Sequence, residues 1–165
     1  MEIRLMPSPR EAAVLDTEEL RASFLLEELF IPGEVCLVYT DLDRAIVGSA
    51  IPTSEALELG IDDALKADFF CQRRELGILN FGSAGSITVD GTTFEMGSHD
   101  CLYIGRGSKE ISLNSSTAAE PAVFYLVSYP AHAAYPTTKA TRADANRVEL
   151  GSKDECNERT IFQYI

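Results

Sequence analysis

The sequence contains no tryptophan and only two histidines, His99 and His132. It also has no apolar run approaching the roughly 20 residues that a membrane-spanning helix requires. Its first residues lack the apolar region of a secretory signal. Only 14 Lys and Arg stand against 26 Asp and Glu, which gives a formal net charge of −12. Because phosphate-binding and lipid-binding surfaces need clustered basic residues, this composition argues against nucleic acid and membrane partners.

Cysteine is sparse as well, and the four cysteines (Cys36, Cys71, Cys101 and Cys156) form no C-x-x-C pair. This spacing gives little support to a zinc-ribbon or thioredoxin-like motif. Without a visible secretory signal, we expect reduced thiols and a cytoplasmic location. Cys71 and Cys101 are expected to pack as small apolar groups rather than to act as nucleophiles. The 165 residues are enough for a single domain, 1–165, with its own core.

The stretch from 73 to 114 carries the strongest structural pattern in the chain. Apolar and polar residues alternate, as at Ile87 and Val89, and glycines recur at short intervals. This combination predicts consecutive antiparallel hairpins. Asp90-Gly91 is the clearest turn, because a type I′ turn needs two residues with positive φ.

Weaker patterns predict the remaining elements. Asp16 and Glu19 form a capping box for a short helix from Thr17 to about Leu25. β-Branched and aromatic runs predict strands at 34–40, 44–51 and 122–129, while 54–59 fits either strand or helix. Residues 131–165 have little periodicity, and we expect an extended tail or inter-domain segment there. The sum is an all-β, antiparallel barrel or jelly roll with a short N-terminal helix.

Within this pattern, several positions resemble the two sequence motifs of the cupins. Glu75 and Gly82 match the end of the first motif, and Gly107 and Asn114 match the second. At the positions of the metal ligands, the sequence departs from both cupin motifs. Glu110 stands where the second motif has histidine. The two histidines of the first motif would fall at Asp68 and Phe70 or at Phe69 and Cys71. We therefore expect a cupin-like fold whose metal site is absent, because a transition metal needs three or four converging donors.

Longer runs resemble the N-terminal half of the 5-keto-4-deoxyuronate isomerase family, also called 4-deoxy-L-threo-5-hexosulose-uronate ketol-isomerases. These runs are DTEELRASFLLEELF, YTDLDRAIVG, RRELGILNFG, GSITVDG, LYIGRGSKE, PAHAAYPTTKAT and ERTIFQYI. The resemblance implies an enzyme of pectin and polyuronate breakdown that converts 5-keto-4-deoxyuronate to 3-deoxy-D-glycero-2,5-hexodiulosonate. It also implies zinc bound in a second, C-terminal cupin half that this sequence does not contain, and a hexameric assembly.

Two adjacent residues are candidates for contact with such a substrate. Side chains next to each other in a strand point to opposite faces, so at most one of Arg73 and Arg74 faces the interior. An inward Arg74 would hold a uronate carboxylate with two hydrogen bonds, and Glu75 would orient it. The alternative is an internal ion pair that only fixes the strand.

Two further candidates follow in the tail. His132 would carry a proton at near-neutral pH, or would be a loop histidine that hydrogen-bonds to backbone. Lys139 would contact a carboxylate, or would simply be solvated.

Two functions remain open. In the first, the complete protein is an aldose-ketose type isomerase and this chain is its metal-free half, inactive alone. In the second, the chain is a non-catalytic cupin module for oligomerisation or sugar binding, with the apolar end 161–165 as its interface.

Overall fold

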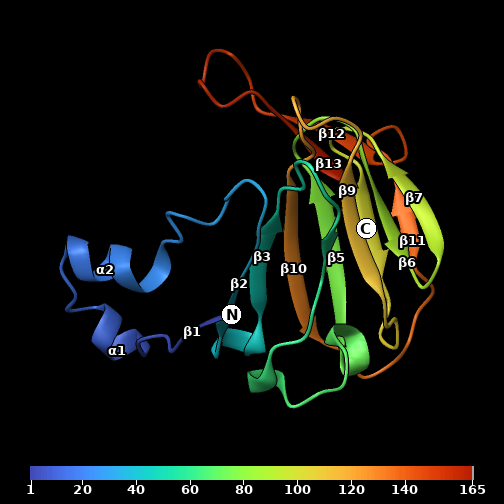
Figure 1. Cartoon of the computed structure of the whole chain (residues 1–165). Helices are drawn as coiled ribbons and strands as arrows, with labels where there is room; N and C mark the ends of the chain where they lie inside the picture. The colour runs from blue at the N-terminus through green and yellow to red at the C-terminus, as the bar shows by residue number, and fades with distance from the viewer. Residues whose placement is uncertain (165) are drawn as a thin grey trace.

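The computed structural model describes residues 1–164, and most of its strands lie in two facing sheets (Figure 1). The larger sheet has the order β1 (Glu2–Arg4), β2 (Val35–Thr40), β3 (Ile46–Ala50), β10 (Phe124–Pro130), β5 (Arg74–Asn80), β8 (Cys101–Ile104) and β11 (Thr138–Ala140). The smaller sheet has the order β4 (Leu57–Glu58), β9 (Ile111–Ser115), β6 (Gly85–Val89) and β7 (Thr92–Met96). This is the predicted all-β jelly roll. Its sheets do not close into a barrel, and β1 pairs with β2 in parallel.

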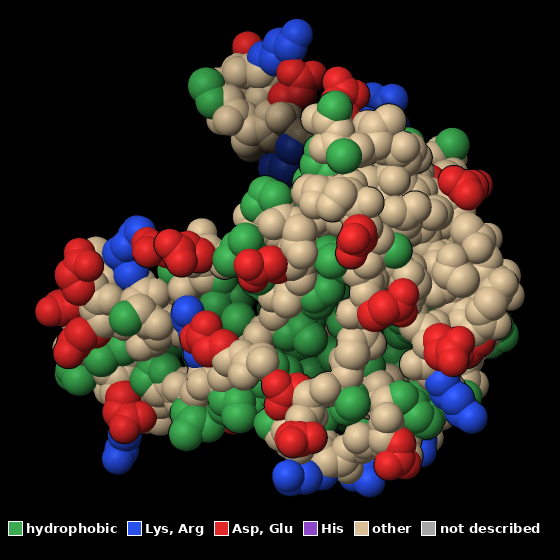
Figure 2. Space-filling model, viewed as in Figure 1, with side chains coloured by type: hydrophobic (Ala, Val, Ile, Leu, Met, Phe, Trp, Pro, Cys, Tyr) green, Lys and Arg blue, Asp and Glu red, His purple; other side chains and the backbone are tan. Residues whose placement is uncertain are grey.

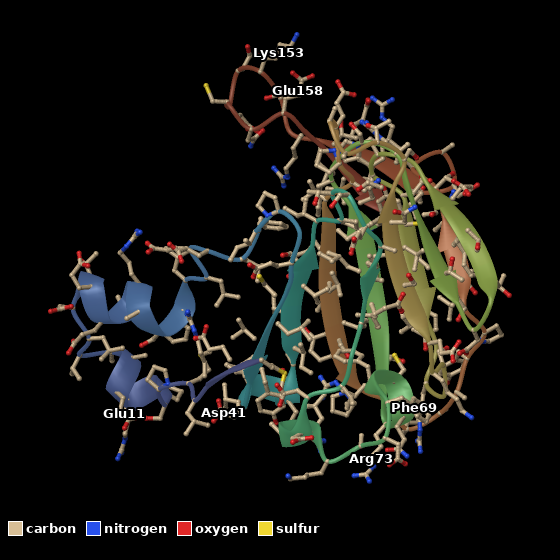
Figure 3. All side chains as sticks on the ribbon, viewed as in Figure 1. Glu11, Asp41, Phe69, Arg73, Lys153 and Glu158 are labelled. Atoms are coloured by element: carbon tan, nitrogen blue, oxygen red, sulfur yellow. The ribbon has the colours of Figure 1, made fainter. Side chains whose placement is uncertain are left out.

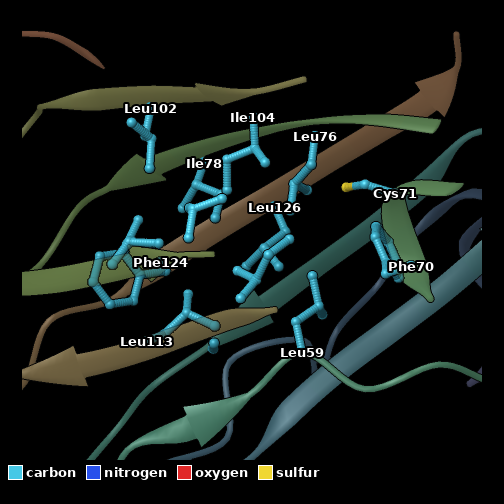
Figure 4. Packing of buried hydrophobic residues seen from close by; sticks show 14 of the residues in the cluster. Leu59, Phe70, Cys71, Leu76, Ile78, Leu102, Ile104, Leu113, Phe124 and Leu126 are labelled. Carbon is cyan, nitrogen blue, oxygen red and sulfur yellow. The ribbon is translucent and has the colours of Figure 1, made fainter. Parts of the chain in front are cut away.

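The core fills the space between these two sheets (Figure 4). Side chains alternate strictly along β5, where Leu76 and Ile78 are fully buried and their neighbours are only partly covered. Ile87 and Leu113 come from the smaller sheet, and Phe124 comes from β10. Each such side chain stabilises the fold by about 1.5–3 kcal/mol through removal of apolar surface from water. Period-two alternation therefore separates an inner, apolar face from an outer face on the larger sheet.

The hairpin between β6 and β7 confirms the predicted Asp90-Gly91 turn. Asp90 has φ 48° and Gly91 has φ 81°, and Val89 pairs with Thr92. The Asp90 carboxylate also accepts hydrogen bonds from the backbone N–H groups of Lys109 and Glu110, at 3.0 and 2.9 Å. This turn thus also anchors the loop that leads into β9.

An N-terminal arm, residues 5–28, projects beside the sheets and carries α1 (Pro9–Ala12) and α2 (Thr17–Phe24) (Figure 1). The capping box of Asp16 and Glu19 is confirmed, whereas α1 and β1 were not predicted. Neither helix buries a residue, and Val14 is 82% exposed. Figure 2 shows acidic side chains along the outer side of the arm and hydrophobic ones along its lower edge. No helix in residues 1–164 has the length and apolarity needed to cross a bilayer.

Three short 3₁₀ turns connect the strands: Leu42–Arg44, Asp63–Leu65 and Phe70–Gln72. The last of these turns lies just before β5. Phe70 and Cys71 are buried there because the turn folds them under the end of the sandwich, and β5 begins at Arg74 (Figure 4).

Residues 131–164 are more regular than their sequence suggests. They contain β11, which joins the edge of the larger sheet beside β8, and the hairpin β12 (Asn146–Leu150) with β13 (Arg159–Gln163). Both faces of this hairpin are largely exposed, so no alternation of apolar residues marks it. Within the predicted interface 161–165, Phe162 packs under Arg142 at 4.5 Å and the Tyr164 hydroxyl donates to the His99 carbonyl at 2.6 Å. Ile165 lies outside the described residues.

Candidate functional site

Arg74 is the first residue of β5, and its side chain is held among neutral acceptors at the end of the sandwich. The residue is 7% exposed. Its Nε donates to Ser128 Oγ at 3.1 Å, and its Nη2 donates to the carbonyls of Ser128 and Arg44 at 2.8 and 2.6 Å. Glu75 projects from the opposite face of the strand. The internal ion pair between Arg74 and Glu75 is therefore not found, and within residues 1–164 Arg74 has no acidic partner.

Arg74 lines a pocket of about 330 Å³, which we call the arginine pocket. Arg44 and Arg73 line it too; Arg73 lies at the lower end of the molecule in Figure 3. Burial lowers the pKa of Arg74, and the neighbouring Arg44 lowers it further, whereas Tyr39 and Cys71 act in the opposite direction. The remaining lining residues are Met1, Ile3, Tyr39, Ala64, Leu65, Ala67, Phe70 and Pro130.

Glu75 lies on the outer face of the larger sheet and accepts a hydrogen bond from the Tyr103 hydroxyl at 2.9 Å. Burial, together with this carboxylate, raises the pKa of Tyr103 to about 12 and so favours the protonated phenol. Both residues line a groove of about 580 Å³, the tyrosine groove, which also includes Tyr129, Tyr135 and Tyr164. A carboxylate paired with a phenol among aromatic faces can exchange a proton or hold a sugar hydroxyl.

The other two predicted residues lie apart from both pockets. Lys139, on β11, forms an ion pair with Asp100 at 2.8 Å and also donates to the carbonyl of Glu95. His132 is exposed in the loop that follows β10. The structure therefore brings none of the four predicted site residues together in one site: Arg74 belongs to the arginine pocket and Glu75 to the tyrosine groove.

The residues at the cupin ligand positions do not fit a zinc ion. Phe70 and Cys71 are buried in the core, Glu75 faces outward, and Glu110 is exposed. In the described part of the chain, no three side chains of His, Cys, Asp or Glu gather in one place. Tetrahedral zinc needs such a gathering, with donor distances of about 2.0–2.3 Å.

Arg44 and Tyr39 are site residues that sequence reasoning missed. Tyr39 is in β2, and Arg44 ends the turn Leu42–Arg44 with φ 53°, an unusual conformation for a side-chain-bearing residue. Because Tyr39 and Arg44 are distant from Arg74 in the sequence, the sequence alone does not show that the three residues line one pocket. The hairpin pairing of β2 with β3, and of β3 with β10, brings them to the end of β5. An arginine at the end of a tight turn is the one local signal of this site in the sequence.

The two-sheet jelly roll and the partial match to the cupin motifs define a chain of the cupin-like class. Its fold resembles the crystal structure of an IolB-like protein from Salmonella typhimurium LT2, with a TM-score of 0.56, 12% identity, and coverage of 73% of this chain and 44% of that one. A family model described as KduI/IolB matches residues 30–165, and the chain belongs to this family.

Curated relatives are similar along the entire chain. The 4-deoxy-L-threo-5-hexosulose-uronate ketol-isomerase of Formosa agariphila is 48% identical over 164 residues, which are 99% of this chain and 59% of the relative. The enzyme of that name from Shouchella clausii is 45% identical over 165 residues, which are 100% of this chain and 60% of the relative. The chain thus spans about three fifths of the length of these isomerases.

Proposed function

We propose that this chain is the metal-free half of a ketol-isomerase that converts a 5-keto-4-deoxyuronate to 3-deoxy-D-glycero-2,5-hexodiulosonate in polyuronate breakdown. The observation that carries the proposal is 45–48% identity to named ketol-isomerases over essentially all of its residues. Such an isomerisation moves a proton between adjacent carbons through an enediol, which requires a base and a polarised carbonyl. Zinc, where the complete enzyme uses it, supplies that polarisation. The misfit of the cupin ligand positions supports a metal site outside the described residues, 1–164.

The chain's own role in this proposal is to bind and position. Its partners are the uronate-derived sugar, a C-terminal cupin half and further copies of the same protein in a homo-oligomer. The tyrosine groove supports the C-terminal cupin half as a partner. Its aromatic lining is partly open to solvent on the outer face of the larger sheet, where a second domain could pack. Glu75 and Tyr103 would then lie at the contact between the halves, where the pair would hold a substrate hydroxyl or accept a proton from it.

An activity assay with separated halves tests the proposal. Residues 1–165 are purified alone, and also mixed with the remaining part of the Formosa agariphila relative, with zinc present in both samples. We expect no turnover by the chain alone and turnover in the mixture or in a covalent fusion. Zinc-dependent isomerisation by the chain alone would contradict the proposal, as would a folded, zinc-loaded fusion without activity.

The second candidate function, a non-catalytic module for oligomerisation or sugar binding, is favoured by the N-terminal arm. The arm carries apolar side chains without cover in the described residues, among them Phe24, which is 50% exposed, and Val14. Sedimentation velocity of the chain, of Phe24→Ser and of the control Glu18→Gln distinguishes the cases. Self-association that Phe24→Ser weakens and Glu18→Gln preserves would support the module. A wild-type monomer would exclude self-assembly through the arm.

A further inference from the structure

The arginine pocket is a positive site on a strongly negative chain. Three of its lining residues are arginines (Arg44, Arg73 and Arg74), and no acidic side chain lines it. None of the three forms an ion pair within residues 1–164, although the chain carries a net charge of −12. Met1 also lines the pocket, but its amino group is already paired with Asp62 at 2.8 Å. The local excess of positive charge therefore has no ion-pair partner among the described side chains.

Arg74 has one terminal nitrogen left for a ligand. Its Nε and Nη2 are occupied by Ser128 and by the Arg44 carbonyl, whereas Nη1 makes no hydrogen bond in the described structure. No side-chain nitrogen in the described residues is both buried and unbonded, so Nη1 keeps some exposed surface, and Arg74 lines the pocket. A buried charge without a partner is costly, because it loses hydration without gaining an opposite charge. An anion at Nη1 would offset that cost.

The rest of the lining selects the kind of anion. Ile3, Leu65, Phe70 and Pro130 supply apolar surface beside the guanidinium groups, and Tyr39 supplies a phenol. A volume of about 330 Å³ lies within the roughly 300–1,000 Å³ typical of small-molecule sites. An inorganic anion would leave this apolar surface unused, whereas an organic acid would cover it. Guanidinium groups match the planar geometry of a carboxylate.

We propose that the arginine pocket binds a small organic carboxylate of sugar-acid size. The carboxylate lies against Arg74 Nη1 and between Arg44 and Arg73, and the carbon skeleton packs on the apolar wall. The inference rests on the proposed function for its choice of a uronate as the probe, and it deepens that function by assigning the pocket that holds the carboxylate. The pocket can bind such a ligand whether or not the chain takes part in isomerisation, and the test below measures binding to this chain without any assay of activity.

Calorimetric titration of the full chain with galacturonate is the direct test, with galactose and inorganic phosphate as separate arms. We expect saturable binding of one galacturonate per chain at millimolar concentrations or below, weakening as salt is added. Galactose, which lacks the carboxylate, should not bind detectably, and phosphate should bind at least tenfold more weakly. No saturable signal with galacturonate, or phosphate binding of equal strength, would overturn the proposal.

Arg44 and Arg73 are exposed, so substituting them locates the binding site without disturbing the buried Arg74. Arg44→Gln and Arg73→Gln should each weaken galacturonate binding about tenfold, the factor that corresponds to about 1.4 kcal/mol. Arg10→Gln is the matched control, because Arg10 is an exposed arginine on α1 outside the pocket. Equal losses in all three variants would mean a general charge effect and would overturn the assignment. Circular dichroism of each variant verifies that the fold is retained.

Discussion

Tyr103 on β8 donates its phenolic hydrogen to the Glu75 carboxylate on β5 at a distance of 2.9 Å, across the outer face of the larger sheet. Tyr103 is paired in register with Gly77, and Glu75 lies one diagonal step away. Because Gly77 has no side chain, the aromatic ring is able to extend toward Glu75. This contact links two central strands on the face opposite the core.

The Tyr103→Phe variant should unfold more easily than the wild type. Removing the hydroxyl deletes a hydrogen bond to a charged acceptor, and we expect a loss of about 1–2 kcal/mol in the free energy of unfolding. Urea denaturation followed by circular dichroism measures this loss. Tyr129→Phe is the matched control, because Tyr129 lies in the same groove and is largely exposed. Equal losses in the two variants would contradict a specific role of the Glu75 contact.

Alkaline pH should destabilise the protein through buried protonated groups. Burial raises the pKa of the Cys71 thiol from 9.0 to about 12. The folded chain therefore retains a proton that the unfolded chain releases above pH 9. Stability is then fully present below pH 9 and falls as the pH rises toward 12. Tyr103, with its pKa raised from 10.0 to about 12, adds to the same trend above pH 10.

Urea midpoints measured between pH 8 and 10.5 check this expectation. The Cys71→Ala variant should show a shallower decline above pH 9 than the wild type, because it has no thiol to titrate. Cys156→Ala serves as the control, since Cys156 is exposed. An unchanged slope in Cys71→Ala would show that another group causes the decline.

Gly105→Ala should be destabilising, because an added Cβ would lie 1.9 Å from the backbone oxygen of Tyr135. Either the end of β8 or the segment that crosses it must move, at a cost of about 1–3 kcal/mol or more. Gly60→Ala is the matched control, with no atom within 4 Å of its added Cβ. Thermal unfolding should show a lower Tm for Gly105→Ala and little change for Gly60→Ala. Similar Tm values for both would argue against close approach at Gly105.

Leu76→Ala should reveal how much one core position contributes. Leu76 is fully buried between the sheets, so truncation leaves a cavity and costs about 2–5 kcal/mol. Leu5→Ala removes the same atoms from a residue that is 78% exposed, and should change stability by less than about 0.5 kcal/mol. Urea denaturation compares the two. A loss below about 1 kcal/mol for Leu76→Ala would place this residue outside a well-packed core.

Local sequence signals predicted local structure well. The Asp90-Gly91 turn and the capping box of Asp16 and Glu19 both depend on residues within a few positions of each other, and both are present. The opposite orientations of Arg74 and Glu75 also follow from strand geometry, and the predicted contact between these two residues was wrong because it overlooked that geometry.

Features that depend on pairing between distant segments could not be predicted. Arg44 reaches the pocket of Arg74 because β3 pairs with β10, and β10 pairs with β5. Tyr135 reaches the tyrosine groove because the chain after β10 crosses the end of β8 at Gly105. The β12–β13 hairpin was missed because both of its faces are exposed, which removes the alternation that normally marks a strand.

The margins of the larger sheet have a further consequence. Its outermost strands, β1 and β11, are each three residues long. A strand of this length offers few unpaired peptide groups on which a foreign strand could grow. Lateral addition of strands, the route by which exposed β-structure converts to fibrils, therefore has little template on β1 and β11.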